Sequence, residues 1–169
     1  MADLVDVLIE DERWAKVGLA DIAQASGLAT LRHLDMNPDH FEISLLGCND
    51  ARIAELNADF REKPGATNVL SWPSKERAGK TPGGTPELPI HDSTEPEELG
   101  DIAIAYETCK YEAERANTDF GHHIAHLLVH ATLHLLGYDH INEQDAALME
   151  GIEQQILACM GHPDPYGNE

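Results

Sequence analysis

The most informative stretch of the sequence is residues 130–140, which read His130-Ala131-Thr132-Leu133-His134-Leu135-Leu136-Gly137-Tyr138-Asp139-His140. His130 and His134 are four residues apart, so on a helix their side chains lie on the same face. Gly137 permits a left-handed turn that ends the helix, and His140 can then return toward the first two histidines. Three neutral histidines with an open fourth position are typical of a catalytic zinc site. The spacing therefore predicts one metal ion bound by His130, His134 and His140.

The same ligand spacing occurs in the metzincin proteases, which place a glutamate directly after the first histidine as the general base. Here that position is Ala131, whose methyl group cannot accept a proton. The spacing therefore supports a metal ion but argues against peptide hydrolysis by that route. Asp139 has two candidate roles, either to orient a ligand imidazole or to cap the turn. Three histidines also suit nickel, copper or iron, so the spacing does not single out zinc.

Six of the ten histidines lie between residues 122 and 140. His122 and His126 continue the same i, i+4 ladder toward the N-terminus, and His123 is adjacent to it. A single histidine on a helix is more often packed or solvated than bound to a metal. We therefore expect these three residues to have structural roles.

The helix of the histidine motif and the one after it both have recognisable N-terminal caps. Asp119 or Thr118 can cap a helix that runs to Leu136. Asn142 opens a last helix that ends near Met160. The chain therefore ends in two long helices, the first of which carries the predicted metal ligands.

Outside this region, four segments have the short and partly β-branched character of strands, namely residues 3–9, 41–46, 67–72 and 99–105. Apolar residues at helical spacing predict helices at residues 12–26, from 49 or 50 to about 60, and 106–117. Gly27 is expected to interrupt the first helix, with a shorter turn following at residues 28–34. Residues 73–98 contain five of the nine prolines and six acids, which is typical of a surface loop or insertion.

This order of elements predicts the fold class. The predicted order is a strand, a helix, a strand, a helix, two strands and then helices. This order favours an α+β domain over residues 1–160, followed by a flexible tail at residues 161–169. We expect a central mixed sheet of about four strands, packed with about five helices. The metal-binding helix should lie at the centre of this arrangement.

The composition is that of a single small domain. The chain has 169 residues, and no apolar stretch approaches the roughly 20 residues that a membrane span needs. The N-terminus lacks the basic segment of a secretory signal. Three widely separated cysteines are typical of reduced thiols, so we expect a cytoplasmic protein.

The formal net charge of −20 argues against nonspecific coating of nucleic acid, because contacts to phosphates need lysine and arginine. Five of the eleven basic residues nevertheless fall within twenty positions, namely Arg61, Lys63, Lys75, Arg77 and Lys80. This cluster is either a local cationic patch or a solvated loop. Arg61 follows an amphipathic helix, where it can neutralise the helix dipole or hold a phosphate with two hydrogen bonds. Spacing alone leaves both alternatives open.

Several of these segments together resemble the YbeY family of bacterial rRNA-maturation endoribonucleases. The resemblance is carried by His130 to His140, Leu56-Asn57 with Phe60-Arg61, Thr67-Asn68-Val69-Leu70-Ser71-Trp72-Pro73 and Gly100-Asp101-Ile102-Ala103-Ile104, within roughly residues 40–160. It implies a single α+β domain with a mixed sheet. It also implies one zinc ion (Zn2+) per chain on three histidines, which match His130, His134 and His140. The functional arginine of the family matches Arg61.

The resemblance further implies a cytoplasmic, single-strand-specific endoribonuclease that acts in 16S rRNA 3′-end maturation and ribosome quality control. The implied partners are rRNA and the small ribosomal subunit, with a ribosomal protein or a GTPase as further candidates and no membrane. Three residues depart from the usual pattern: Ala131 stands in place of Gly, Asn68 in place of Asp, and Trp72 in place of Phe. Asn68 removes a charge, which argues against a role that needs a carboxylate there.

The resemblance implies RNA as the substrate, while the residues themselves supply the metal site and Arg61 as a candidate phosphate-binding group. Together they predict metal-assisted cleavage of an RNA phosphodiester. Three other functions remain open. The first is a zinc metalloprotease-like hydrolase, and the second is a non-catalytic ribosome assembly factor with a structural zinc ion. The third is a metal-storage or metal-sensing protein, which would bind more than one ion per chain.

Overall fold

Four strands form one mixed sheet in the order β1-β2-β4-β3. The computed structural model describes residues 3–61, 65–75, 83–86, 95–139 and 142–165, except the side chains of residues 59–61. The strands are β1 (Val5–Ile9), β2 (Phe41–Cys48), β3 (Val69–Pro73) and β4 (Glu97–Ala105). The pairs β1–β2 and β2–β4 are parallel, whereas β3 runs antiparallel to β4. The predicted α+β fold with a four-stranded mixed sheet is confirmed.

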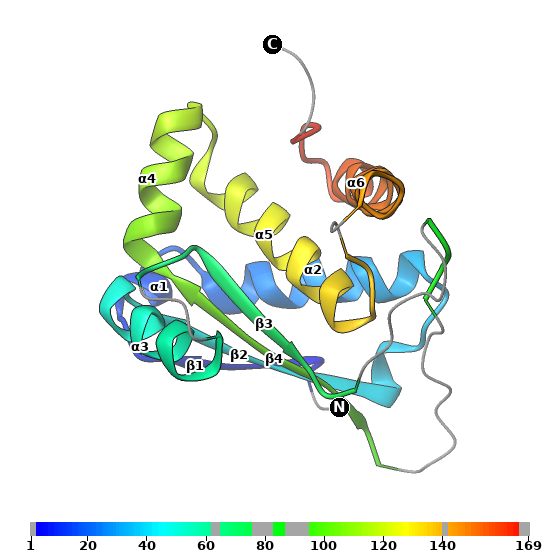
Figure 1. The fold of residues 1–169 in the computed structure, drawn as a ribbon, viewed down its shortest axis with the longest axis horizontal. Coiled ribbons are helices and arrows are strands. Elements are labelled where there is room, and N and C mark those ends of the chain that lie inside the picture. The colour runs from blue at the N-terminus through cyan, green and yellow to red at the C-terminus, as the bar shows by residue number, and fades with distance from the viewer. Residues whose placement is uncertain (1–2, 62–64, 76–82, 87–94, 140–141, 166–169) are drawn as a thin grey trace.

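Six helices pack around this sheet. They are α1 (Arg13–Lys16), α2 (Leu19–His33), α3 (Asp50–Arg61), α4 (Tyr106–Ala116), α5 (Phe120–Leu135) and α6 (Glu143–Cys159). Helices α2, α5 and α6 lie on one side of the sheet, and α3 lies on the other (Figure 1). Helix α5 contacts α2, α4, α6, β3 and β4. The helix with the histidine motif is therefore central, as predicted.

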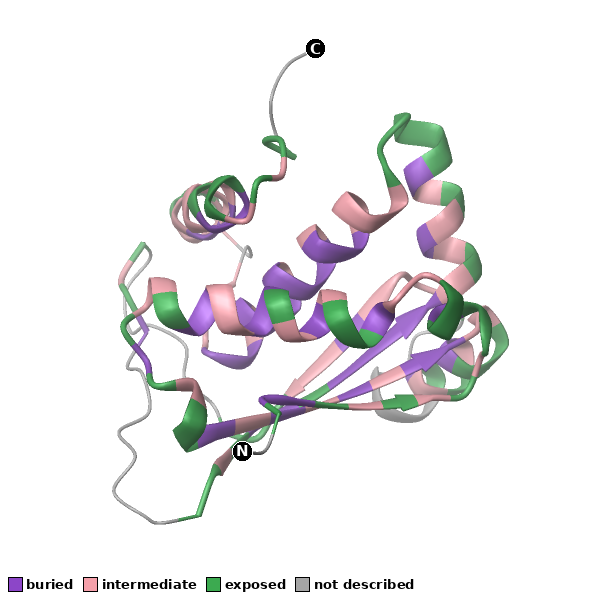
Figure 2. Cartoon of the chain, turned by 180° about the vertical axis from the view of Figure 1, so that it is seen from behind, coloured by how far each residue is buried: buried purple, intermediate pink, exposed green. Residues whose placement is uncertain are grey.

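The sequence of α5 explains its position. Nine of its side chains are buried, and all of them are apolar or small, namely Ile124, Ala125, Leu127, Leu128, Val129, Ala131, Thr132, Leu133 and Leu135 (Figure 2). A helix that is apolar over most of its circumference is stable only when other elements cover it. Asp119 caps its N-terminus by accepting a hydrogen bond from His122 N at 3.2 Å. In the part of the chain that the structure describes, no helix has the length and apolarity to cross a bilayer.

Helix α3 is fixed to the opposite face of the sheet. Its residue Ile53 belongs to a small second core with Cys48, Leu70 and Ala103. The first turns of α3 and α4 cap each other, because Asp50 N donates to Glu107 Oε1 at 2.9 Å and Thr108 N donates to Asp50 Oδ1 at 3.0 Å. These contacts fix the start of α3, whose last residue is Arg61.

The break in the first helical region and both ends of the loop at 73–98 lie elsewhere than predicted. The first helical region breaks at Gly18, which has a φ of +76°, and not at Gly27, which lies inside α2. Gly27 is there because α2 packs closely on β1: a Cβ at this position would lie 3.0 Å from Leu4 Cδ2. The predicted loop at 73–98 is shorter at both ends, since β3 includes Pro73 and β4 begins at Glu97.

Gly100 is the glycine on which the packing of α5 against the sheet depends most directly. It lies in β4 with a φ of +148°, and a Cβ there would overlap the carbonyl oxygen of Trp72 and lie 2.8 Å from Leu135 Cδ2. We expect Gly100→Ala to lower the free energy of unfolding by about 3 kcal/mol, because both backbone strain and overpacking oppose it. Urea unfolding measures this loss. Gly151→Ala in α6, where nothing lies within 4 Å of the added Cβ, is the control and should not destabilise. A loss at Gly100 of less than about 1 kcal/mol would contradict this packing.

The C-terminal end of α6 packs against the start of α5 through two histidines. The His122 and His162 rings meet edge to face with centroids 4.5 Å apart, and His162 N donates to Leu157 O at 2.8 Å. Residues 161–162, predicted to belong to a flexible tail, thus form the closing turn of α6. Burial, followed by repulsion from His122, lowers the pKa of His162 from its usual 6.5.

This contact predicts a loss of stability in acid. Because the folded state disfavours protonated His162, its contribution is fully present above pH 6.5 and is lost as the pH falls through the lower folded pKa. We expect the unfolding free energy to fall less between pH 7.5 and 5.5 in His162→Gln than in the wild type. Urea titrations of both proteins at the two pH values measure the difference. Equal losses would exclude His162 as a source of acid sensitivity.

Candidate metal centre

His130 and His134 lie one turn apart on α5 and face each other, as their spacing predicted. Their Nε2 atoms are 3.0 Å apart, and the rings meet nearly perpendicular, at 83°. Ligands of a tetrahedral zinc ion with bonds of ~2.0–2.1 Å are separated by about 3.3 Å, which is close to this distance. The side chains retain 21% and 22% of their exposure, so the pair is open to solvent on one side.

A buried carboxylate lies behind the first of these rings. Glu153 of α6 has no exposed side-chain surface, and its Oε2 is 2.6 Å from His130 Nδ1. Its other oxygen is 2.9 Å from His126 Nε2. A neutral imidazole that donates its Nδ1 proton keeps the Nε2 lone pair free for a metal ion. A His130 ring that donates its Nδ1 proton to Glu153 would leave Nε2, the nitrogen that faces His134, able to act as a ligand.

The turn after α5 has the predicted left-handed conformation, with a φ of +102° at Gly137. Main-chain hydrogen bonds close it, from Gly137 N to His134 O and from Tyr138 N to Leu133 O, both at 3.0 Å. Asp139 Oδ1 lies 4.0 Å from His134 Nδ1, which is longer than a hydrogen bond. The turn thus brings the chain back beside the second ring.

Among the described residues, the two imidazole nitrogens of His130 and His134 fit a metal ion. Two imidazole nitrogens that face each other at 3.0 Å require a proton or a metal ion between them, because their lone pairs repel. The third predicted ligand, His140, lies outside the described residues. Without it, no three candidate ligands among the described residues converge on a single point. The structure therefore places two of the three predicted ligands together.

The residue after the first histidine points into the protein. Ala131 is 1% exposed and belongs to the main core. Neither its chemistry nor its orientation supplies a general base at the position that the metzincins use. The protease-like alternative thus lacks its base at that position.

The neighbouring histidines of α5 have structural partners. His123 Nε2 is 3.0 Å from Glu112 Oε1 on α4, and the same carboxylate accepts a hydrogen bond from Asn68 Nδ2 at 3.0 Å. This contact explains why an amide is tolerated at position 68: an aspartate there would face Glu112 with a like charge. His122 packs on His162.

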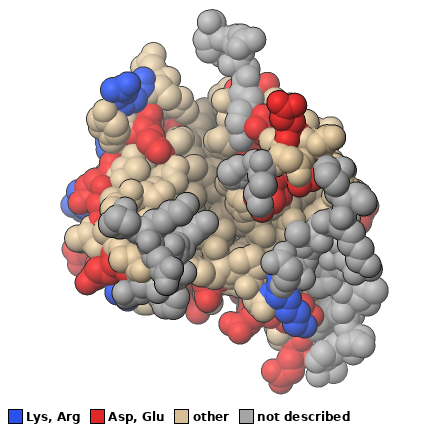
Figure 3. Space-filling view, viewed as in Figure 1, with Lys and Arg blue, Asp and Glu red and all other residues tan. Residues whose placement is uncertain are grey.

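The predicted arginine lies at the last residue of α3, and its side chain is outside the described residues. The same holds for Lys63, Arg77 and Lys80, so the choice between a cationic patch and a solvated loop is not tested. On the face in Figure 3, acidic side chains are widespread, while the described basic side chains are scattered.

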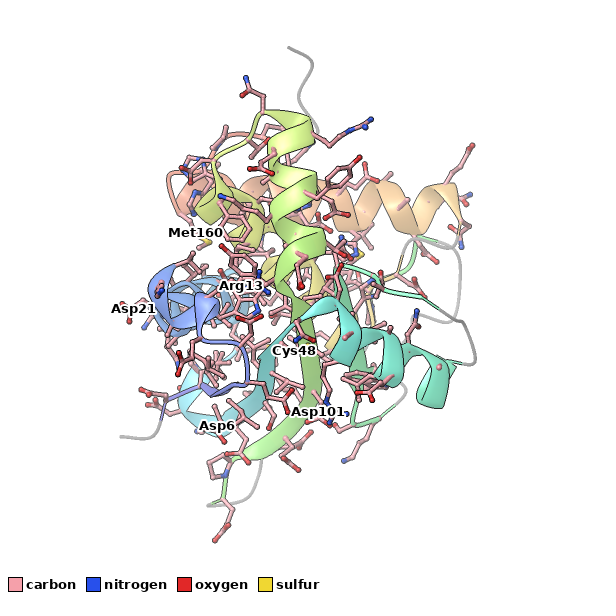
Figure 4. The ribbon with its side chains drawn as sticks, turned by 90° about the vertical axis from the view of Figure 1, so that its left-hand side faces the viewer. Asp6, Arg13, Asp21, Cys48, Asp101 and Met160 are labelled. Atoms are coloured by element: carbon pink, nitrogen blue, oxygen red, sulfur yellow. The ribbon has the colours of Figure 1, made fainter. Side chains whose placement is uncertain are left out.

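A groove lies on the opposite face of the sheet from α5, beside α3. This groove has a volume of about 590 Å³ and is lined by apolar side chains together with Asp6, Glu10, Asp101 and Arg52. Asp6 and Asp101 are labelled in Figure 4. Arg52 is paired with Glu10 at 3.5 Å, so the charges lining the groove are mostly negative. Such a lining does not favour phosphate groups.

Sequence reasoning missed two acidic residues of this region, Glu112 and Glu153. The signal for Glu153 was its position on the apolar stripe of α6, between Met149 and Ile156, both of which are fully buried. An acid at such a position is rare unless it is paired. Glu112 lies on the half-exposed α4 and had no comparable signal.

Comparisons with known proteins identify the family of this chain. A sequence profile of the family described as Endoribonuclease YbeY matches residues 9–161. Proteins named Endoribonuclease YbeY from Ruegeria pomeroyi and Cereibacter sphaeroides are each 53% identical, over 98% of this chain and 99% and 100% of the relatives, respectively. A solution structure of a Thermotoga maritima protein matches with a TM-score of 0.55, covering 97% of this chain and 99% of that one; at 16% identity, this similarity concerns the fold alone. The chain belongs to the YbeY endoribonuclease family.

Proposed function

We propose that this protein is a zinc-dependent endoribonuclease that cleaves single-stranded RNA in 16S rRNA 3′-end maturation and ribosome quality control. Family membership supports the RNA substrate, and the histidine pair supports the metal. The observation that carries the proposal is the 3.0 Å approach of His130 Nε2 and His134 Nε2 on a solvent-accessible part of α5.

The ligands of the proposed ion are His130, His134 and His140. A bound zinc ion supplies Lewis acidity at a phosphoryl oxygen or at water. His130 and His134 bind through Nε2, and their approach on one helix face means that the site needs little rearrangement to form. His140 is three residues beyond Gly137, whose left-handed conformation supports its assignment as the third ligand.

Arg61 is the proposed phosphate-binding residue. Its guanidinium presents a planar set of donors that matches two phosphate oxygens. A cation held there would also stabilise the charge that develops on the phosphate during cleavage. Helix α3, which ends at Arg61, is fixed at its start by the reciprocal caps of Asp50 and Glu107.

The substrate of the proposed reaction is a single-stranded RNA or an RNA end, where the unstacked backbone can reach the site. The negative charge of the chain is compatible with this function if a partner delivers the substrate. We therefore propose the small ribosomal subunit as the cellular location of the reaction, with a ribosomal protein or a GTPase as the delivering partner.

Cleavage assays on matched RNAs test the proposal. Purified protein should cleave a single-stranded RNA that ends like the 16S rRNA precursor, and should spare the same sequence in a duplex. A chelator should abolish cleavage, and stoichiometric zinc should restore it. Cleavage of peptides in a broad screen, without cleavage of RNA, would favour the metalloprotease-like alternative.

A further inference from the structure

Glu153 carries a buried carboxylate that needs hydrogen-bond donors. It lies on α6 with no exposed side-chain surface, among apolar neighbours of the main core. A carboxylate removed from water is costly unless donors satisfy both of its oxygens. Among the described residues, two imidazoles of α5 lie within hydrogen-bond distance of this carboxylate, those of His126 and His130.

The two rings present different nitrogens to this carboxylate. Oε1 is 2.9 Å from His126 Nε2, and Oε2 is 2.6 Å from His130 Nδ1. A carboxylate only accepts hydrogen bonds, so each of these nitrogens must carry a proton. A single acid therefore imposes opposite tautomers on two histidines that are one helical turn apart.

We propose that Glu153 is a positioning residue for the metal site, which fixes His130 as the Nδ1–H tautomer so that its Nε2 lone pair faces His134. His126 is the second donor to this carboxylate and serves as its anchor, while the ion is bound by other histidines. The part of this inference that concerns the metal rests on the proposed function. The part that concerns the tautomers does not.

The two contacts of Glu153 differ, and this difference distinguishes a positioning role from a purely structural contact between α5 and α6. A hydrogen bond that only holds α6 against α5 contributes to stability, and either ring nitrogen of the histidine could make it. The shorter contact, at 2.6 Å, goes instead to the ring whose other nitrogen lies 3.0 Å from His134 Nε2. Carboxylates behind ligand histidines orient the ring and raise its basicity, and their loss typically weakens metal binding by about 10–100-fold.

The first test measures the tautomers in metal-free wild-type protein by long-range ¹H–¹⁵N NMR near pH 8. We expect His130 as the Nδ1–H form and His126 as the Nε2–H form. Detection of His130 as the Nε2–H form would overturn the proposal. This readout needs neither activity nor bound zinc, so it is separate from failure of the proposed function, which would appear as absence of zinc binding by the wild type.

The second test uses Glu153→Gln, which keeps the shape of the side chain and removes its charge. We expect a zinc affinity about 10–100-fold lower, measured by competition with a chromophoric chelator. Glu150→Gln, one turn earlier on the same helix and only half-buried, is the matched control and should bind zinc like the wild type. A folded Glu153→Gln protein with wild-type zinc affinity would show that Glu153 is only a structural tie. If this variant does not fold, the tautomers measured in the wild-type protein still test the proposal.

Discussion

Replacing His134 with alanine is expected to reduce bound zinc from about one ion per chain to nearly none, and RNA cleavage by at least about 100-fold. His134 Nε2 lies 3.0 Å from His130 Nε2, and two remaining imidazoles cannot hold a zinc ion against competing buffer ligands. Metal analysis of the dialysed protein and cleavage of a labelled single-stranded RNA measure both losses.

The fold of this variant separates a catalytic zinc ion from a structural one. His134 is one of the partly exposed residues of α5, and the core beneath it is apolar, so we expect an unchanged circular dichroism spectrum. An unfolded His134→Ala protein would favour the non-catalytic assembly factor with structural zinc. His33→Ala in α2 controls for the loss of any histidine and should keep zinc and activity.

Arg61→Ala is expected to lower RNA cleavage by about 10²–10³-fold, which is the usual cost of losing one group that stabilises charge in the transition state. Zinc content should not change, because the proposed ligands are all histidines. Single-turnover cleavage at saturating RNA separates this effect from weaker substrate binding. Full activity of the variant would exclude Arg61 from the reaction.

Two further arginine variants sharpen this result. Arg61→Lys keeps the charge but loses the paired donors, so its cleavage should fall between the wild type and the alanine variant. Arg52→Ala is the matched control on the same helix, where the side chain pairs with Glu10 and Glu55. It should leave cleavage unchanged. Equal losses at both positions would point to an effect on α3 as a whole.

Much of the fold was predictable because local signals and burial agreed. The caps at Asp119 and Asn142, both confirmed, combine a short polar side chain with a following apolar helix. The strands were found from their apolar character, although β4 begins two residues before the predicted 99, at Glu97. The break predicted at Gly27 was wrong because helix propensity disfavours glycine, whereas the close packing of α2 against Leu4 and Val5 favours it.

Of the candidate site, the sequence predicted only residues that lie close together along the chain. His130 and His134 were found because helical geometry alone brings them together. Glu153 comes from a different helix, so its contact with His130 depends on how α6 crosses α5, which no local pattern specifies. The same holds for Glu112, whose partners Asn68 and His123 lie 44 and 11 residues away.

The proposed reaction depends on three imidazoles, those of His130, His134 and His140, that together bind one zinc ion. Zinc-edge X-ray absorption of the purified protein, with metal content measured on the same sample, tests it most directly. We expect one zinc ion per chain with three nitrogen neighbours at about 2.0–2.1 Å and a non-protein oxygen in the fourth position. A sample without stoichiometric metal, or an ion closed by four protein ligands, would contradict it.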